Sequence, residues 1–195
     1  MEAFVTRALG PATWDAYAAL IERHNGVWGG CWCLVFHEGQ KKDSLDDRRA
    51  RKKALVAAGQ SHAALVFDGE RAVGWAQYGP RAELLHIKNR RAYDAGAAAA
   101  DEAPADWRIT CFFVDRDYRR QGVGAQALAG ALELIGAAGG GRVEGFPEAI
   151  EGQKTSAGFL WNGTLGMFER AGFAPVRRIG KHRVVVRRQV AGGTG

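Results

Sequence analysis

The chain has 195 residues and a mass of 21.0 kDa, enough for one domain with its own core. A hydrophobic content of 47% with 25% charged residues is typical of a folded protein and argues against disorder. No run of about 18 apolar residues occurs and the first residues lack the order of a signal peptide, so we expect a cytoplasmic protein without a membrane partner. The odd count of three cysteines agrees with a reducing compartment, and the net charge of +6 suits a polyanionic ligand.

The first expected elements are a strand and a helix. Phe4–Leu9 alternates between apolar and polar residues, which favours a strand, and the Gly-Pro pair that follows would end it. Thr13 is of a residue type that caps helices. We therefore expect a helix from Thr13 to about Asn25, with aromatic and aliphatic side chains on one face.

A second helix is predicted by a capping box. Ser44 and Asp47 have the spacing at which each side chain meets the main chain of the other, and the helix would stop near Gly59. Acids in its first turn precede the basic run Arg48–Lys53, an order that the helix dipole favours. Because this run has few apolar neighbours, we expect it to form a solvated helix face.

The segment between these helices is rich in glycine and aromatic residues and has no clean period. His24, Cys31, Cys33 and His37 place four side chains of metal-ligating type close together there. Structural zinc sites usually separate their cysteines by about two to four residues, whereas a single residue separates Cys31 from Cys33. We therefore expect cysteines packed beside tryptophans, and no metal.

A hairpin is expected next, because Ala63–Phe67 and Ala72–Tyr78 are β-forming runs that flank the turn sequence Asp68–Arg71. The long segment 80–107 follows it. A helix is expected around Glu83–Ala92, and then an alanine-rich acidic linker. A lid over a site and a flexible surface loop are both compatible with this segment.

The most informative stretch is a strand, Arg108–Val114, followed by a charged turn and an Ala/Leu-rich helix that ends near Gly139. The N–H groups at the start of a helix bind anions, and Gly122 and Gly124 would let a phosphate approach the main chain with no Cβ in its way. The spacing matches neither the P-loop nor the dinucleotide fingerprint. It is Arg119-x-x-Gly122-x-Gly124.

The last third of the chain predicts short elements. They are a strand (Arg142–Phe146), a loop (147–162), a short helix (Thr164–Phe173) with Gly172 at its end, and a hairpin (Val176–Ile179 with His182–Arg187). We expect the glycine-rich residues 191–195 to form a disordered tail.

The turn motif in its strand–turn–helix setting and the Gly172-Phe173 pair resemble the GNAT superfamily of acyl-CoA-dependent N-acetyltransferases. The resemblance implies an α/β (α+β) fold with a mixed, splayed central sheet of about seven strands and helices on both faces. One domain would cover residues 1–190. Segment 80–107 would be an insertion between the third and fourth strands.

The resemblance also implies acetyl-CoA as the acyl donor, and transfer to a primary amine of a small molecule or peptide by direct attack in a ternary complex. A bulge near Thr110–Phe112 would direct one N–H at the thioester carbonyl. The residues that would bind the coenzyme are Phe112, Phe113, Val114, Arg119, Arg120, Gln121, Gly122, Val123 and Gly124.

The catalytic assignment is less specific. Glu144 and His37 are the candidates for the general base, and Trp28, Trp32 and Glu38 lie in the loop where members of the superfamily usually hold the acceptor. Many members have a tyrosine as general acid four residues before the glycine of Gly-Phe. Phe168 takes that position here and cannot donate a proton.

Two other hypotheses remain open at this stage. Phe168 is compatible with a non-catalytic acyl-CoA-binding module, and the charge alone is compatible with a basic nucleic-acid-binding protein, although no motif for nucleic acid is present. We therefore expect no nucleic-acid partner. The acceptor amine and a homodimeric state are left undecided.

Overall fold

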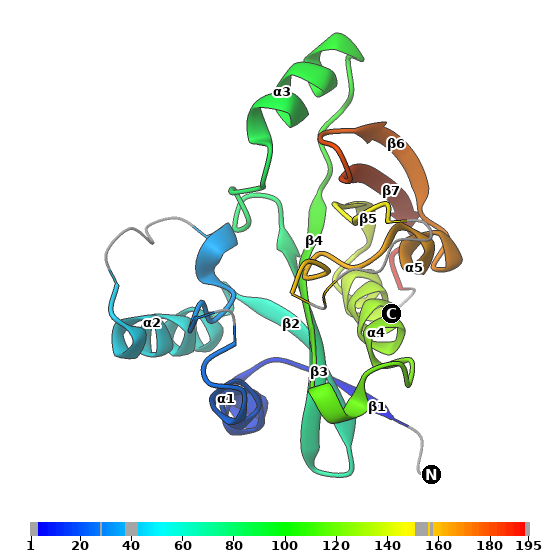
Figure 1. Ribbon diagram of the computed structural model, residues 1–195. Coiled ribbons are helices and arrows are strands. Elements are labelled where there is room, and N and C mark those ends of the chain that lie inside the picture. Colours follow the sequence, from blue (N-terminus) through cyan, green and yellow to red (C-terminus); the bar gives the residue numbers. More distant parts are fainter. Residues whose placement is uncertain (1–3, 28, 38–42, 151–155, 157, 194–195) are drawn as a thin grey trace.

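A single mixed sheet organises the computed structural model, which describes residues 4–27, 29–37, 43–150, 156 and 158–193. Its order is β1-β2-β3-β4-β5-β7-β6, and all neighbours are antiparallel except the parallel pair β4 and β5 (Figure 1). The strands are β1 (Val5–Ala8), β2 (His62–Asp68), β3 (Arg71–Pro80), β4 (Trp107–Val114), β5 (Gly141–Gly145), β6 (Ala174–Arg178) and β7 (Val184–Val190). The expected seven-stranded mixed sheet is confirmed.

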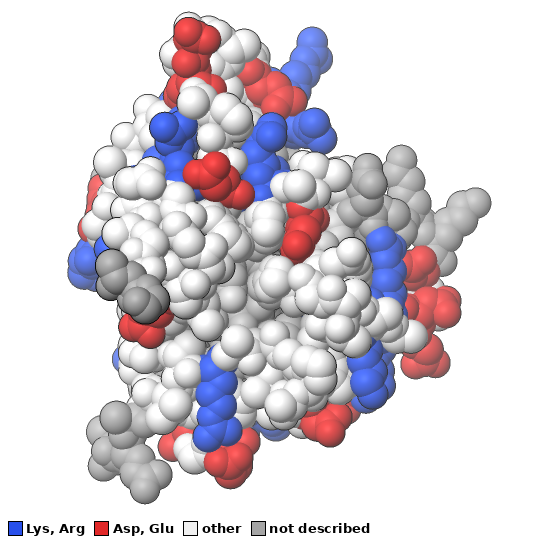
Figure 2. All heavy atoms as spheres, turned by 180° about the vertical axis from the view of Figure 1, so that it is seen from behind, with Lys and Arg blue, Asp and Glu red and all other residues white. Residues whose placement is uncertain are grey.

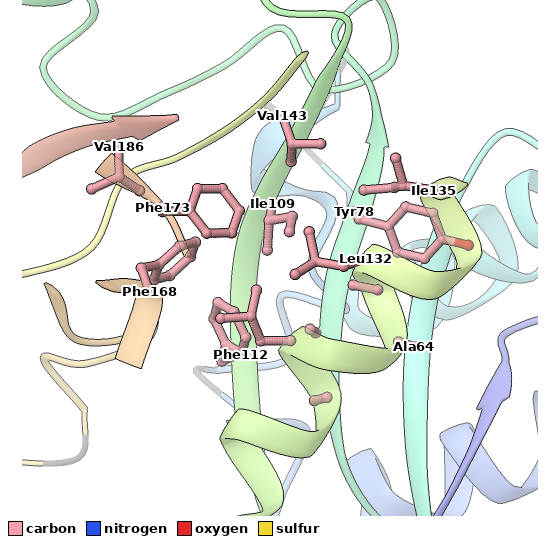
Figure 3. Packing of buried hydrophobic residues seen from close by; sticks show 14 of the residues in the cluster. Ala64, Tyr78, Ile109, Phe112, Leu132, Ile135, Val143, Phe168, Phe173 and Val186 are labelled. Carbon is pink, nitrogen blue, oxygen red and sulfur yellow. The ribbon is translucent and has the colours of Figure 1, made fainter. Parts of the chain in front are cut away.

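Helices cover both faces of the sheet, as expected. On one face α1 (Trp14–Arg23) and α2 (Leu45–Ala57) enclose an aromatic core, and on the other α4 (Val123–Ala137) and α5 (Leu165–Arg170) enclose an aliphatic one. Figure 3 shows the second core, where side chains of α4 meet those of the central strands and of α5. Within the described residues, no helix has the length and apolar character needed to span a bilayer.

The two helix starts expected from capping differ. Ser44 and Asp47 form the capping box, since the Asp47 N–H donates to Ser44 Oγ at 3.2 Å and the Ser44 N–H donates to Asp47 Oδ2 at 3.1 Å. The expectation that Thr13 caps α1 with its side chain is wrong. Its hydroxyl donates instead to the Ala8 carbonyl at 2.8 Å and ties the helix start to the end of β1.

The helix of segment 80–107 lies later than expected. It is α3 (Arg90–Ala99), not Glu83–Ala92, and it extends from one end of the sheet (Figure 1). Asn89, with φ at +61°, adopts the left-handed conformation and cannot continue a helix from the residues before it. The alanine-rich stretch expected to be a linker is the helix itself, because alanine has the highest intrinsic helix propensity.

The basic run on α2 is not wholly solvated. Lys52 is completely buried, and its Nζ donates to the Ser61 hydroxyl at 2.7 Å. The rest of Arg48–Lys53 is exposed or half-buried.

The face of the molecule in Figure 2 mixes both signs of charge, and its described residues form no continuous basic stripe of the kind that nucleic-acid-binding proteins present.

The described end of the chain lies against α4. The Gly193 N–H donates to the Gly136 carbonyl at 2.8 Å, and a Cβ on Gly192 would come within 2.8 Å of the Gly139 carbonyl oxygen. These contacts hold residues 191–193 beside the last turn of α4. Residues 194 and 195 lie outside the described residues.

Candidate active site

The central strands β4 and β5 separate after a short parallel contact. Trp107–Ile109 pairs with Val143–Gly145, and no later pair joins the two strands within the described residues. Beyond that point the Phe112 N–H donates to the carbonyl of Trp161 at 2.7 Å. The splayed sheet predicted from the sequence is present, and the described part of the loop before α5 lies against the free edge of β4.

The expected bulge lies at the start of the splay. Between β3 and β4 the register shifts, so that Gln77 faces Cys111 and Tyr78 faces Ile109, and Thr110 has no partner of its own. The Thr110 hydroxyl is buried and has no hydrogen-bond partner among the described residues. A bulge with an unsatisfied polar atom beside an open strand edge is suited to receive a polar ligand.

Asn162 is a residue that sequence analysis missed. It follows Trp161 in the chain, is 3% exposed, and leaves its Oδ1 without a described partner. An asparagine just before the helix-capping Thr164 resembles an ordinary turn residue, so no local pattern distinguishes it. Its buried Oδ1 and the Thr110 hydroxyl are thus two polar atoms without a described partner.

The turn between β4 and α4 has the form of an anion site. Arg120 and Gly122 both adopt left-handed conformations, with φ at +62° and +84°. The first hydrogen bond of the helix runs from the Gln126 N–H to the Gly122 carbonyl at 2.9 Å, which leaves the first three helical N–H groups without an acceptor in the helix. A Cβ on Gly122 would meet no atom within 4 Å. Open space at a helix N-terminus fits the pyrophosphate of a coenzyme.

Asp115, at the end of β4, holds this turn in place. Its buried carboxylate lies 3.0 Å from Arg23, 3.1 Å from Arg71 and 3.2 Å from His24, and it accepts the Asp117 N–H at 3.2 Å. Burial alone would raise the pKa of Asp115, but the Asp117 N–H, His24 and Arg23 outweigh it and keep the pKa well below its usual range. The carboxylate therefore anchors the turn to α1 and β3.

The β4 residues expected to bind the coenzyme differ in where their N–H groups point and in which core their side chains pack. The Asp115 N–H bonds to β3, so by alternation the N–H groups of Phe112 and Val114 point away from β3, toward the splay. The Phe113 ring stacks on Trp75 at 4.8 Å in the aromatic core. The Phe112 ring meets Phe168 at 5.8 Å in the aliphatic core (Figure 3), so the fully buried Phe168 lies directly beside β4.

Glu144 is surrounded by donors. The Tyr93 hydroxyl lies 3.0 and 2.9 Å from its two oxygens, Arg108 Nε lies 2.9 Å from Oε1, and Arg187 Nη2 lies 3.6 Å from Oε2. The carboxylate is fully buried, opposite the first residues of β4 and before the strands separate. Its oxygens are thus already engaged by partners from α3, β4 and β7.

His37 belongs to a buried polar cluster on the other side of the bulge. Its Nε2 lies 3.0 Å from Gln77 Nε2 and 3.4 Å from the Ser61 hydroxyl, which in turn accepts from Lys52. Burial, with smaller contributions from Lys52 and Arg51, lowers the pKa of His37 to about 3. The imidazole is therefore neutral at physiological pH.

The described part of the glycine- and aromatic-rich segment between α1 and α2 is tightly packed. Trp32 is 5% exposed and stacks on Trp14 at 5.8 Å. Trp28 and Glu38 lie outside the described residues. Cys33 and Cys111 bring their thiols within 3.1 Å of each other, and the described residues contain no group of three or more His, Cys, Asp or Glu that could hold a metal.

The neutral state of His37 makes stability depend on pH. The pKa of His37 falls from 6.5 in the unfolded chain to about 3, so the unfolded chain binds the extra proton between these values. The stabilisation is complete above pH 6.5 and is lost as the pH falls toward 3. Between pH 7 and pH 5, wild type should lose about 2 kcal/mol more of its free energy of unfolding than His37→Gln does.

Urea unfolding at several pH values measures this difference. His86→Gln removes an exposed histidine and is the matched control, so it should follow the wild-type curve. Parallel curves for wild type and His37→Gln would show that His37 titrates normally.

Comparison with known proteins agrees with this geometry. The profile of the acetyltransferase (GNAT) family matches residues 17–159. Similar solved structures include an acetyltransferase from Thermus thermophilus (15% identity, TM-score 0.52, 96% of this chain and 97% of that one) and a mosquito arylalkylamine N-acetyltransferase like 5b (14%, 0.56, 96% and 100%). A third is paia N-acetyltransferase from Thermoplasma acidophilum in complex with coenzyme A (12%, 0.51, 96% and 99%). Sequence comparison found no relative among curated proteins.

The family match covers well over half of the chain, and the solved structures share its fold over almost their whole length. The glycine turn is the feature that the sequence motif predicted, and the splay and the bulge are those that the resemblance to GNAT proteins implied. The chain belongs to the acetyltransferase (GNAT) family, whose members use acetyl-CoA as the acyl donor.

Proposed function

We propose that this protein transfers an acetyl group from acetyl-CoA to a primary amine of a small molecule or peptide, by direct attack in a ternary complex. The observation that carries the proposal is the open edge of β4 running into the turn at Gly122, because together they provide main-chain donors for an extended chain and then for a pyrophosphate. The coenzyme supplies the thioester whose carbonyl carbon the amine attacks.

The residues of the chain would hold this donor along β4. The N–H groups of Phe112 and Val114 would bind the pantetheine amides, so the Trp161 carbonyl would have to leave Phe112 when the coenzyme enters. The free N–H groups at the start of α4 would bind the pyrophosphate, with Arg119 and Arg120 exposed beside them. The bulge at Thr110 would turn a strand N–H toward the thioester oxygen.

We further propose that the acceptor amine gives its proton to solvent. Glu144 and His37, the two candidate bases, already have hydrogen-bonding partners, and the pKa of His37 is lowered to about 3. At pH 7 the neutral form costs about 4.6 kcal/mol for a lysine-like amine, but only about 1.4 kcal/mol for an α-amino group with a pKa near 8. The less basic class of amine therefore needs little help from the protein.

The same arithmetic applies to the leaving group. A thiolate whose free pKa is about 8.5 needs only about 2 kcal/mol of help at pH 7. Phe168 cannot donate a proton, but its ring fills the space between Phe112 and Phe173. Because the thiol is this acidic, the thiolate can leave without a general acid at the position of Phe168.

The pH profile of acetyl transfer tests the proposal. Free thiol release is measured from pH 6 to 10 with acetyl-CoA and two amines that differ in pKa. Because solvent takes the proton, log kcat/KM should rise with a slope of about 1 until it levels at the pKa of each amine. Glu144→Gln should keep the same profile, even if it unfolds more easily.

Three results would count against parts of this proposal. A plateau at one pH for both amines would identify a base on the protein, and loss of the rising limb in Glu144→Gln would identify it as Glu144. Binding of coenzyme A without release of its free thiol from acetyl-CoA in the presence of any amine would contradict transfer itself.

A further inference from the structure

A pocket lies beside the start of β4, outside the residues so far assigned to the coenzyme. Its empty volume is about 260 Å³ and includes space open to solvent. The buried Arg108 guanidinium and Tyr93 ring, 3% and 4% exposed, line it together with the half-buried side chains of Leu85 and Ile87. The cavity proper has a volume of only about 30 Å³, so it has room for one small group such as a carboxylate and not for a whole cofactor.

The charges beneath the pocket do not balance. Arg108 pairs with Glu144 at 2.9 Å, Arg187 pairs with Glu102 at 2.8 Å, and Arg177 also pairs with Glu102. Three guanidinium groups thus share two carboxylates in a largely buried network, which leaves one positive charge uncompensated. The Nε atoms of Arg177 and Arg187 are buried without an acceptor among the described residues. Neither residue lines the pocket, but Arg177 lies over the ring of Tyr93, which does, at 5.0 Å, so the surplus positive charge lies behind the pocket wall. A buried surplus of positive charge favours an anion nearby.

The rim of the pocket adds to this surplus. Arg90 pairs with Asp94 at 3.3 Å and is neutralised, whereas no ion pair of the exposed Arg81 is found among the described residues. Arg81 directly follows β3 and Arg108 lies in β4, and the antiparallel pairing of Gly79 with Arg108 and of Pro80 with Trp107 brings the two arginines together. Arg108 Nε already donates to Glu144 at 2.9 Å and its Nη1 to the Leu84 carbonyl at 2.6 Å, which leaves Nη2 for a ligand. A second guanidinium from Arg81 at the same cavity is typical of a carboxylate or phosphate site.

The pocket also lies on the side from which an acceptor must come. The donor would run from the bulge at Thr110 toward Gly122, which leaves the first residues of β4 uncovered by it. Arg108 precedes Thr110 by two residues, or about 7 Å along a strand. An amine at the thioester and an oxyanion in the pocket could therefore belong to one small molecule.

We infer that this pocket binds an oxyanion of the acceptor, so that the preferred substrates are small amines carrying a carboxylate or phosphonate a few bonds from the nitrogen. The inference rests on the proposed acetyl transfer. Arg108 and Arg81 bind the oxyanion, and the side chains of Leu85 and Ile87 contact the methylene groups between the two charges.

Paired amines test the inference. Thiol release is compared for 4-aminobutanoate, 3-aminopropylphosphonate and propylamine at one pH. Wild type should favour the two anionic amines, and in Arg81→Ala the ratio of their kcat/KM to that of propylamine should fall about 10- to 100-fold, the loss expected for a charge-assisted hydrogen bond. Arg81→Lys should restore part of the ratio. Arg91→Ala removes a cation of α3 that does not line the pocket, and it should leave the ratio unchanged.

The outcomes separate the two proposals. Equal kcat/KM for anionic and neutral amines in wild type would overturn this inference and leave acetyl transfer intact. If no amine causes release of thiol from acetyl-CoA, the proposed function fails. NMR titration of wild type and of both variants with glutarate then tests the pocket alone. Weaker glutarate binding in Arg81→Ala but not in Arg91→Ala supports the site, and equal binding in all three proteins overturns it.

Discussion

Gly122→Glu should abolish coenzyme binding, with a rise in the dissociation constant of coenzyme A of at least about 100-fold. The residue has φ at +84°, where any side chain is strained, and its Cβ would enter the open space in front of the first turn of α4. A carboxylate there would repel the pyrophosphate and compete for the same N–H groups. Losing two charge-assisted hydrogen bonds of about 1.5 to 3 kcal/mol each is sufficient for this effect. Isothermal titration with coenzyme A measures it.

Gly139→Glu is the matched control at the other end of α4. Gly139 also has a left-handed conformation, with φ at +103°, and a Cβ there would also meet nothing within 4 Å. Its strain and its added charge are therefore similar, but it lies at the wrong end of the helix to touch the coenzyme. Equal loss of affinity in both variants would show that Gly122 acts through stability alone, and unchanged affinity in Gly122→Glu would place the pyrophosphate elsewhere.

Phe168→Ala should lower the free energy of unfolding by about 3 to 5 kcal/mol, equivalent to a fall in Tm of about 10 °C. The ring is fully buried and lies edge-on to Phe112 at 5.8 Å and to Phe173 at 4.9 Å (Figure 3). It also fills the space above Gly145, where a Cβ would come within 2.4 Å of the ring. Its removal leaves a cavity between β4, β5 and α5. Urea unfolding and calorimetry measure the loss.

Phe159→Ala is the control for this prediction. Phe159 is 37% exposed in the loop before α5, so its loss should change the free energy of unfolding by less than about 0.5 kcal/mol. A small effect of Phe168→Ala would mean that the neighbouring side chains collapse into the vacated space.

The elements predicted well are those whose signals are local. The glycine turn and the apolar face of α4 depend on residues within about four positions of each other, and so do the capping box at Ser44 and the hairpin around Asp68–Arg71. The helix expected at Glu83–Ala92 was misplaced because helix-forming residues lie on both sides of Asn89, and only one side can form the helix. The left-handed Asn89 and the alanines that follow it decide in favour of α3.

The sequence by itself determined the family and the glycine turn before α4, because a strand, two glycines and a helix start are specified by neighbouring residues. Only the tertiary structure decided the environments of the charged side chains. Glu144 meets Tyr93 and Arg108, and Lys52 is buried against Ser61, through contacts between elements far apart in the chain. Periodicity and composition do not encode which distant partner a buried charge will find. The pocket beside Arg108, for which we propose an oxyanion of the acceptor, therefore became visible only when α3 and β4 were brought together.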